Sequence, residues 1–352
     1  MAAPLATDDL DWILANTRGL WSEMRGQRIF ITGGTGFFGC WLVESFLHAN
    51  RVEKLGAQAT VLTRDPAAFA AKAPHLASDP TLALLAGDVR DFALPEGEFR
   101  YVLHAATEAS AKQAAENPVE MLETILRGTE RTLEFAATRG TQKYLLTSSG
   151  AVYGTQPPSI SHLAEEYSGA PNQLDPASVY SEGKRAAELM CAVYGKTHGI
   201  ECKIARCFAF VGPHLPLDAH FAIGNFIRDA MRGESILVQG DGTPKRSYLY
   251  AADLAIWLWT MLFRAPALDP FNIGSDQAIS ISELASTVLT AIGSTAHVQI
   301  AHSPTPGAQL RQYVPSIDKA RRELGLRCEI SLLDAIRRTA AWHGYPVNLN
   351  PL

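Results

Sequence analysis

The stretch RIFITGGTGFFG, residues 28–39, decides the fold. Its first five residues are mostly apolar and β-branched or aromatic, which predicts a buried strand, and glycines follow at 33, 36 and 39. Gly33 permits a tight turn, Gly36 lets backbone N–H groups approach an anion, and Gly39 allows close packing of a helix on the strand. A glycine trio between a strand and a helix predicts a dinucleotide site at the helix N-terminus, beside Phe37 and Phe38.

Short apolar runs alternate with helical periods beyond this loop. Helices are expected at 116–139 and 178–198, and strands at 28–32, 59–63, 82–86, 100–104, 143–147 and 202–208. This alternation predicts an α/β protein with a Rossmann-type doubly wound parallel sheet.

We expect the dinucleotide-binding domain at 27–208, with a substrate-facing loop at 154–177. Proline-punctuated shorter elements at 209–352 predict a smaller, mixed C-terminal lobe for the substrate, with 251–275 returning to the first domain. Residues 1–26 form an N-terminal arm with a short amphipathic helix, and the sequence leaves open whether it packs on its own chain or on a second copy.

Composition narrows the class of protein. The net charge of −5 and the absence of basic runs argue against a nucleic-acid partner. Five cysteines without CxxC spacing predict reduced thiols and no metal site. No apolar run reaches the roughly 18 residues of a membrane span, and residues 1–24 lack a secretory pattern. We therefore expect a soluble, cytoplasmic protein without a membrane partner.

Three residues predict catalysis. Tyr180 and Lys184 lie four apart and share one face of the expected helix 178–198. A nearby ammonium favours phenolate, so we expect Lys184 to lower the pKa of Tyr180 toward neutrality and make it a general acid or base. Ser149 follows the fifth strand, at the sheet edge where ligands bind, and its hydroxyl can hydrogen-bond a substrate oxygen.

The chain resembles the extended short-chain dehydrogenases of the NAD-dependent epimerase/dehydratase family, which modify nucleotide sugars. The glycine spacing, Ser149, and Tyr180 with Lys184 carry this resemblance from residue 27 onward. It implies that Asp88 and Val89 flank the adenine and that Lys184 also holds the cofactor ribose. It further implies that the segment at the fourth strand runs beside the cofactor, with His104, Ala105 and Ala106.

The resemblance also implies a nucleotide-sugar substrate and a homodimer. The diphosphate would be held by Asn225, Arg246 and, near a further position of this kind, Arg311. His214 matches an acid of members that both epimerise and reduce, although a histidine after a Gly-Pro turn is more often structural. The dimer contact would pair helices 116–139 and 178–198 of two copies.

The residues after Ser149 select among reactions. Family dehydratases carry a carboxylate pair there, and decarboxylases carry a glutamate at the second position, where this chain has Gly150 and Ala151. The cysteine base of epimerase-reductases is missing as well. Reduction of a 4-keto-sugar nucleotide, with Tyr180 as proton donor, is therefore the leading hypothesis. The alternatives are a nucleotide-sugar 4-epimerase that retains NAD and a non-catalytic, cofactor-sensing relative. Ile125 and Ala209 replace asparagines common in the family and leave the sugar undetermined.

The end of the second strand bears on the cofactor. An acid there would bind the adenosine ribose and repel a 2′-phosphate, but this chain has Thr63 followed by Arg64. The arginine fork suits a phosphate, so we expect NADP, with NAD as the alternative. The competing interpretation is that Arg64 pairs with Asp65 or with solvent.

Overall fold

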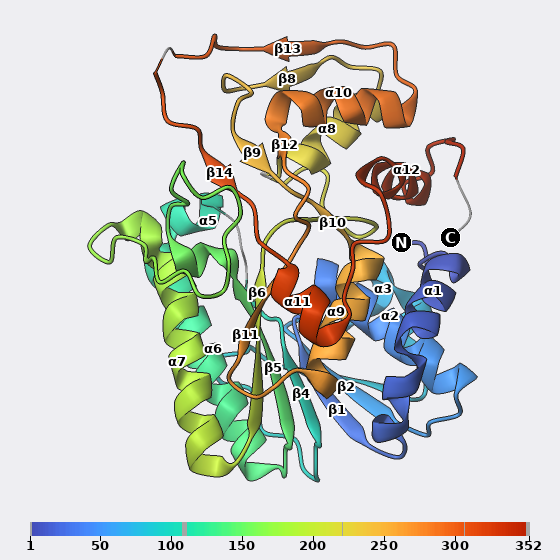
Figure 1. Cartoon of the computed structure of the whole chain (residues 1–352). Helices are drawn as coiled ribbons and strands as arrows, with labels where there is room; N and C mark the ends of the chain where they lie inside the picture. The colour runs from blue at the N-terminus through green and yellow to red at the C-terminus, as the bar shows by residue number, and fades with distance from the viewer. Residues whose placement is uncertain (1, 108–110, 220, 306, 350–352) are drawn as a thin grey trace.

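The computed structural model describes residues 2–107, 111–219, 221–305 and 307–349. Its centre is a seven-stranded parallel sheet in the order β11-β6-β5-β4-β1-β2-β3 (Figure 1). This order places β1 and β4 side by side, where successive strands turn to opposite sides of the sheet. The Rossmann-type fold class is confirmed. The strands are β1 (Arg28–Thr32), β2 (Gln58–Thr63), β3 (Leu82–Ala86), β4 (Tyr101–His104), β5 (Lys143–Ser149), β6 (Glu201–Cys207) and β11 (Pro270–Ile273).

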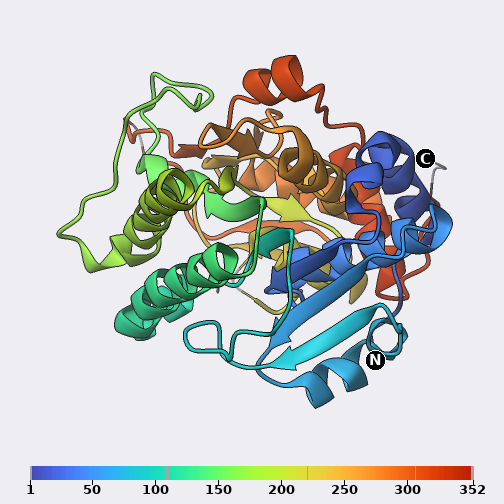
Figure 2. The same cartoon turned by 90° about the horizontal axis from the view of Figure 1, so that it is seen from below.

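Helices cover both faces of the sheet (Figure 2). One face carries α2 (Phe37–Val52) and α9 (Ala251–Arg264), and the other carries α6 (Pro118–Thr138) and α7 (Val179–His198), which pack on each other. The apolar stretch around Trp257 and Trp259 is fully buried, because α9 lies between the sheet and the N-terminal arm. Shorter helices of this domain are α3 (Pro66–Lys72), α4 (Pro74–Ala77), α5 (Ala111–Glu116) and the 3-10 turns Gly150–Tyr153 and Pro176–Ser178.

The N-terminal arm packs on its own chain. Helix α1 (Thr7–Thr17) and the 3-10 helix Arg18–Met24 lie against α2 and α9. Buried Asp9 accepts a hydrogen bond from the Tyr250 hydroxyl at 2.8 Å and pairs with Arg338 at 3.4 Å. The Leu5 N–H donates to Glu44 of α2 at 2.8 Å. Of the two roles left open by the sequence, the structure therefore provides the packing arm.

The second lobe stands above the carboxyl ends of the strands (Figure 1). Its two- and three-stranded sheets use β7 (Phe210–Val211), β8 (Ile236–Val238), β9 (Lys245–Arg246), β10 (Leu249–Tyr250), β12 (Ile279–Ser280), β13 (Val298–Ile300) and β14 (Gln312–Tyr313). The helices after residue 209, apart from α9, are α8 (Ala222–Met231), α10 (Ile281–Ile292), α11 (Asp318–Leu324) and α12 (Leu332–Trp342). A lobe over this edge of a parallel sheet creates a cleft where ligands bind in such folds.

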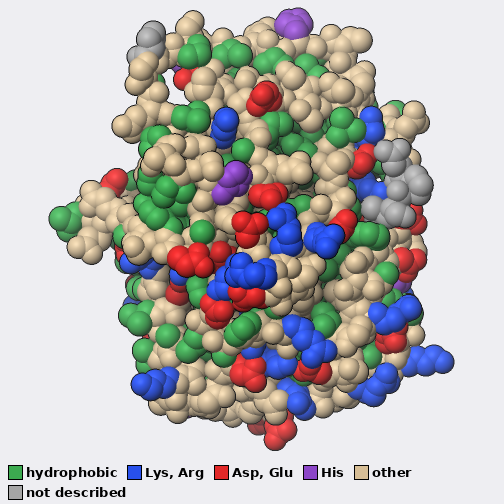
Figure 3. All heavy atoms as spheres, in the orientation of Figure 1, with side chains coloured by type: hydrophobic (Ala, Val, Ile, Leu, Met, Phe, Trp, Pro, Cys, Tyr) green, Lys and Arg blue, Asp and Glu red, His purple; other side chains and the backbone are tan. Residues whose placement is uncertain are grey.

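The surface in Figure 3 mixes both signs of charge around α11. There Arg321 pairs with Asp276 and with Asp318 at 3.1 and 3.0 Å. Across the described ranges, no helix combines the length and the apolar character that crossing a membrane requires.

Candidate active site

The glycine loop between β1 and α2 is shaped for an anion. A Cβ on Gly33, whose φ is +70°, would lie 2.6 Å from the Ala105 carbonyl carbon, and one on Gly39 would lie 2.2 Å from the Gly33 oxygen. A Cβ on Gly36 would meet nothing nearer than 3.4 Å, and α2 starts there without a side-chain cap. The backbone N–H groups at the start of α2 are thus left for a ligand, so these residues fit a dinucleotide pyrophosphate.

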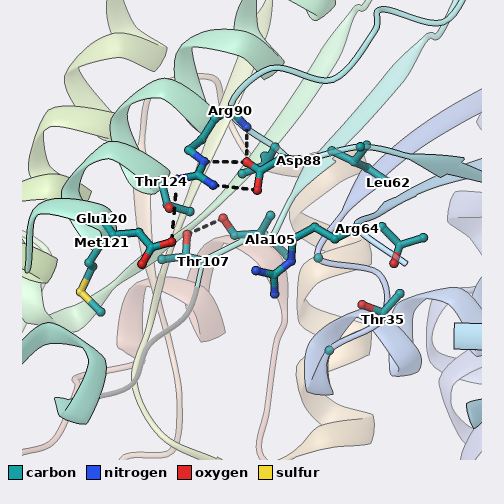
Figure 4. Close-up of a pocket in the computed structure, with 16 residues that line it drawn as sticks. Thr35, Leu62, Arg64, Asp88, Arg90, Ala105, Thr107, Glu120, Met121 and Thr124 are labelled. Atoms are coloured by element: carbon teal, nitrogen blue, oxygen red, sulfur yellow. Dashed lines mark hydrogen bonds and ion pairs between the residues drawn. The ribbon is translucent and has the colours of Figure 1, made fainter. Parts of the chain in front are cut away.

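A cavity of 390 Å³ lies beside this loop, next to the ends of β2 and β3 and the start of α6 (Figure 4). Gly33, Gly36, Thr63, Arg64, Asp88, Val89, Ala105 and Ala106 line it. Arg64 extends into the cavity and makes no ion pair within the described part of the chain, while Asp65 caps α3 by accepting the Ala68 N–H at 2.8 Å. The interpretation that Arg64 pairs with Asp65 therefore finds no support in the structure.

Asp88 is held beside this cavity by Arg90. The Arg90 guanidinium donates to both Asp88 oxygens, at 2.8 and 3.1 Å. This contact, helped by the more distant charge of Arg64, lowers the pKa of Asp88 below its ordinary value. The cavity is thus lined by two guanidinium groups, Arg64 and Arg90, and by two carboxyl side chains, Asp88 and Glu120.

His104 is buried behind the glycine loop, where it contacts Thr32, and it lines neither cavity. Its ring is fully buried at the end of β4, with Nδ1 2.8 Å from the Thr32 hydroxyl and Nε2 3.3 Å from that of Thr129. Burial lowers the pKa of His104 to about 3, so the ring stays neutral. Thr32 in turn accepts the Ala106 N–H at 3.2 Å, which fixes the segment that crosses the cleft.

A second cavity, of 520 Å³, contains the predicted catalytic residues. Ser149 at the end of β5, Tyr180 and Lys184 on α7, and Gly33, Gly36, Phe37 and Phe38 of the glycine loop all line it. The Lys184 ammonium donates to the Thr147 carbonyl at 2.8 Å and to the Thr107 hydroxyl at 2.9 Å, and it lies 5.9 Å from the centre of the Tyr180 ring. The structure thus brings all three residues predicted from separate segments into one cavity.

The electrostatics of this cavity correct one expectation. Burial raises the pKa of Tyr180 to about 12, and hydrogen bonding to Ser149 only partly opposes the shift. Burial also lowers the pKa of Lys184 to about 8. The prediction that Lys184 brings the pKa of Tyr180 toward neutrality is therefore wrong for the protein alone, because burial of the phenol is the largest effect and raises its pKa.

The rest of the cavity wall is largely apolar. Aromatic rings of Phe208, Phe210 and Phe221 face it together with Leu215 and Ile223. Tyr313, from β14 in the second lobe, is the one further phenol among the described lining residues, and the sequence analysis did not single it out. Its strand has only two residues, too short for a periodic signal.

The residues predicted to bind the diphosphate do not come together in the catalytic cavity. Arg246 pairs with Tyr313 across β9 and β14, and its guanidinium lies 5.9 Å from the Tyr313 ring centre. The described residues that line the catalytic cavity include none of the predicted substrate ligands Asn225, Arg246, Arg311 and His214. The side-chain amide oxygen of Asn225 accepts a hydrogen bond from Arg228 at 3.3 Å, and Arg311 is exposed.

His214 has a structural position. It is buried, with Nε2 3.2 Å from Glu44 of α2 and its ring 4.6 Å from that of Trp342. The interpretation of this histidine as structural therefore agrees with its surroundings.

The catalytic cavity has no carboxylate side chain in its described lining. None of the residues that line the catalytic cavity in the described ranges is Asp or Glu. Glu165 accepts the Asn272 N–H at 2.8 Å away from this cavity, and Glu108 lies outside the described residues. Gly150 could not become a larger residue without movement, since a Cβ there would lie 2.5 Å from the Phe208 ring.

A partly buried polar network, which the sequence did not predict, begins at the neighbour of Ser149. Its neighbour Ser148 donates to Glu188 at 2.6 Å, and Glu188 binds Arg206 through both oxygens, at 3.0 and 2.8 Å. Arg206 also donates to the Tyr153 hydroxyl at 3.0 Å. These bonds connect α7 to β5 and β6 and so fix the position of α7 on the sheet.

Comparison with known proteins agrees with this geometry. The model of the NAD dependent epimerase/dehydratase family matches residues 29–274. The chain belongs to this family. Its relatives include UDP-glucuronic acid decarboxylase 5 of Arabidopsis thaliana, 33% identical over 92% of this chain and 90% of the relative. UDP-glucuronic acid decarboxylase 1 of Xenopus tropicalis is 31% identical over 90% of this chain and 72% of that protein.

Solved structures of family members have the same fold. The dTDP-glucose 4,6-dehydratase DesIV of Streptomyces venezuelae, solved with NAD bound, superposes with a TM-score of 0.76 at 26% identity, over 90% of this chain and 97% of that one. The UDP-glucose 4-epimerase of Thermus thermophilus in complex with NAD gives 0.73 at 26% identity, over 90% and 99%. The chain is accordingly an enzyme of a family that includes solved members with NAD bound.

Proposed function

We propose that the protein reduces the 4-keto group of a nucleotide-activated sugar. The observation that carries this proposal is the catalytic cavity itself: it contains Ser149, Tyr180 and Lys184, but no carboxylate from the described residues. Proton transfer at one sugar oxygen needs only the tyrosine, whereas elimination or decarboxylation calls for further acid-base groups. The sugar-nucleotide class is supported by the names of the relatives.

Each residue of the cluster has a role in this reaction. Tyr180 gives its proton to the sugar oxygen as that oxygen gains charge, and Ser149 donates a hydrogen bond to the same oxygen. Lys184, fixed by Thr107 and Thr147, holds the ribose of the cofactor and stabilises the tyrosinate that remains. A nicotinamide bound beside these residues would supply the hydride. Apolar rings on the opposite wall, Phe208 and Phe210 among them, exclude water from the reacting oxygen.

The cofactor proposed is NADP. Arg64 stands at the end of β2 with its guanidinium in the 390 Å³ cavity, where the adenosine would lie, and Thr63 offers no negative charge to repel a 2′-phosphate. A reductase that consumes reduced cofactor in each turnover fits this preference. NAD, which the solved relatives bind, is the alternative.

The second candidate function is a 4-epimerase with retained NAD. The similarity to the Thermus thermophilus UDP-glucose 4-epimerase favours it, and the same tyrosine would serve both half-reactions. A non-catalytic, cofactor-sensing protein is the third hypothesis, and the assembled Ser149, Tyr180 and Lys184 argue against it.

Two further proposals concern the whole molecule. We place it in the cytoplasm, and we propose a homodimer formed through α6 and α7. The exposed apolar side chains Val119, Leu189 and Val193, with 73%, 65% and 54% of their surface accessible, support that contact.

The test is a screen of nucleotide sugars and their 4-keto forms for nicotinamide absorbance change, with products separated by chromatography. The expected result is stoichiometric oxidation of reduced cofactor with a 4-keto substrate. Net conversion of a sugar into its C4 epimer without cofactor turnover would replace the proposal by the epimerase. UDP-glucuronate is included, since release of carbon dioxide from it would refute the argument from missing carboxylates.

Tyr180→Phe tests the proton donor. Loss of the hydroxyl should lower kcat by roughly 10²-fold or more while cofactor affinity stays within about twofold. Tyr248→Phe is the matched control, because Tyr248 is also largely buried but lines a different depression, with Ser275 and Glu283. A Tyr180→Phe enzyme with near-parental kcat would remove Tyr180 from the reaction.

A further inference from the structure

Asn272 lies on β11, at the edge of the large sheet, and is completely buried. Its Nδ2 donates to the Leu163 carbonyl at 2.8 Å and to the Ser316 carbonyl at 3.2 Å. Its Oδ1 accepts from the Tyr153 hydroxyl at 2.8 Å. One side chain therefore holds the 3-10 turn that ends at Tyr153, the loop 154–177 and the segment between β14 and α11.

The orientation of the Asn272 amide is fixed by its partners. Backbone carbonyls only accept hydrogen bonds, so Nδ2 must face Leu163 and Ser316 and Oδ1 must face Tyr153. The Tyr153 hydroxyl consequently donates to Asn272, and its oxygen accepts from Arg206 at 3.0 Å. Both Nδ2 protons are used, so the amide cannot turn over without breaking all three of its bonds.

The segments that Asn272 holds carry two residues of the catalytic cavity. Tyr153 ends the 3-10 turn that begins directly after Ser149, and Ser316 follows Tyr313 by three residues. Ser149 lines the cavity from the sheet domain, and Tyr313 lines it from the second lobe. Asn272 is not among the described residues that line this cavity, so it connects the two walls from behind.

The residues after Asn272 contact the cavity wall as well. The Phe208 N–H donates to the Ile273 carbonyl at 2.9 Å. A Cβ on Gly274 would lie 3.0 Å from the Pro315 ring and 3.2 Å from the Phe208 side chain. The end of β11 is thus packed tightly between the two walls, and a displacement of this strand would move them.

We propose that Asn272 is a positioning residue that fixes the distance between the turn after Ser149 and the segment that carries Tyr313. It thereby sets the width of the catalytic cavity on the substrate side. The cavity that contains Arg64 lies at the opposite end of the sheet, by β2 and β3, so cofactor binding does not depend on this residue. The proposal rests on the proposed function only in that the substrate is a nucleotide sugar.

Asn272→Asp tests the donor role of the amide. The variant keeps the shape of the side chain but replaces Nδ2 by an oxygen that repels the carbonyls of Leu163 and Ser316. We expect kcat/KM to fall about 10- to 100-fold for whichever nucleotide sugar the screen finds to react, since displacements of about 1 Å have effects of this size. The Kd of the reduced nicotinamide cofactor, measured by its fluorescence, should stay within about twofold.

Asn50→Asp is the matched control. Asn50 is also buried, near the end of α2, and its Nδ2 donates to the Ala57 carbonyl at 3.0 Å. It is absent from the described lining of both cavities, so this variant loses a buried donor of the same kind while kcat/KM should stay within about twofold. An equal loss of kcat/KM in the two variants would overturn the proposal, because the effect would then follow from stability alone.

A second variant covers the case in which Asn272→Asp does not fold. Tyr153→Phe keeps the ring and removes only the hydroxyl that donates to Asn272 and accepts from Arg206. We expect a smaller fall in kcat/KM, roughly 3- to 10-fold, with an unchanged cofactor Kd. Parental kcat/KM in either folded variant would overturn the proposal, and so would a weakening of cofactor binding as large as the loss of kcat/KM.

A measurement without substrate separates this proposal from the proposed function. Hydrogen exchange followed by mass spectrometry should show faster exchange at residues 160–167 and 313–317 in Asn272→Asp, but parental exchange there in Asn50→Asp. Unchanged exchange in Asn272→Asp would refute the positioning role even if the enzyme reduces a 4-keto sugar. Faster exchange in a protein without 4-keto reduction would refute the proposed function alone.

Discussion

The buried ammonium of Lys184 should make the stability of the enzyme depend on pH in a predictable direction. In the folded state burial lowers its pKa from 10.5 to about 8, whereas in the unfolded chain the side chain is in water. Between these two values the unfolded state binds more protons than the folded state, so the free energy of unfolding rises with pH. The destabilisation is complete below pH 8 and disappears above pH 10.5.

The size of the effect follows from the two pKa values. Each pKa unit corresponds to about 1.4 kcal/mol, so the charged lysine costs about 3 kcal/mol of unfolding free energy at pH 7. Raising the pH from 7 to 10 removes about 2.5 kcal/mol of this cost. Since total stabilities are typically about 5–15 kcal/mol, the change is large enough to measure.

Urea unfolding at pH 7 and at pH 10 provides the assay. Lys184→Met removes the titrating group, so the stability difference between parent and variant should change by about 2.5 kcal/mol between the two pH values. Other titrating groups are common to both proteins and cancel. The control is Lys196→Met, an exposed position on the same helix. The reasoning fails if the free energies of unfolding of Lys184→Met and the parent change by the same amount between the two pH values, to within about 0.5 kcal/mol. Burial would then impose no measurable cost on the charged form of Lys184.

Three further predictions follow from the site and the surface. Arg64→Ala should lower kcat/KM for NADPH by about 10- to 100-fold and leave NADH nearly unchanged, with exposed Arg51→Ala as control; equal use of both cofactors by the parent would contradict the assignment. The parent should form no 4-keto-6-deoxy product from a nucleotide hexose by mass spectrometry, because Ala151 offers no proton; such a product would disprove this. Light scattering at micromolar concentration should give a dimer mass, and Leu189→Asp combined with Val193→Asp should give a monomer, whereas a monomeric parent would exclude the contact.

Local patterns predicted most of the large sheet. The boundaries 28–32 and 82–86 coincide with β1 and β3, because apolar runs between turn signals mark buried parallel strands. Strand β11 was not predicted as a strand. It is only four residues long and begins with Pro270, so neither alternation nor length distinguishes it from a loop. Its place at the sheet edge comes from pairing with β6, which is a tertiary property.

The sequence likewise predicted some features of the active site and not others. Ser149, Tyr180 and Lys184 could be predicted, since a strand end and a helix face locate side chains relative to one sheet. Tyr313 could not, because its strand has only two residues and it lines the cavity beside segments far away in the chain. The direction of the Tyr180 pKa shift was also beyond the sequence, because it depends on how completely the cavity excludes water.

The N-terminal arm has a consequence for motion. Its first residues bind α2 through Glu44, its helix binds β10 and α12 through Asp9, and the Ala3 carbonyl accepts from Trp342 at 3.0 Å. These partners belong to the sheet domain (α2) and to elements of the second lobe (β10 and α12), so the arm links the two parts of the molecule. A wide hinge opening would break several buried polar contacts together. The arm therefore opposes a wide opening of the two parts, and we expect ligand exchange to depend on smaller movements of the loops around the cleft.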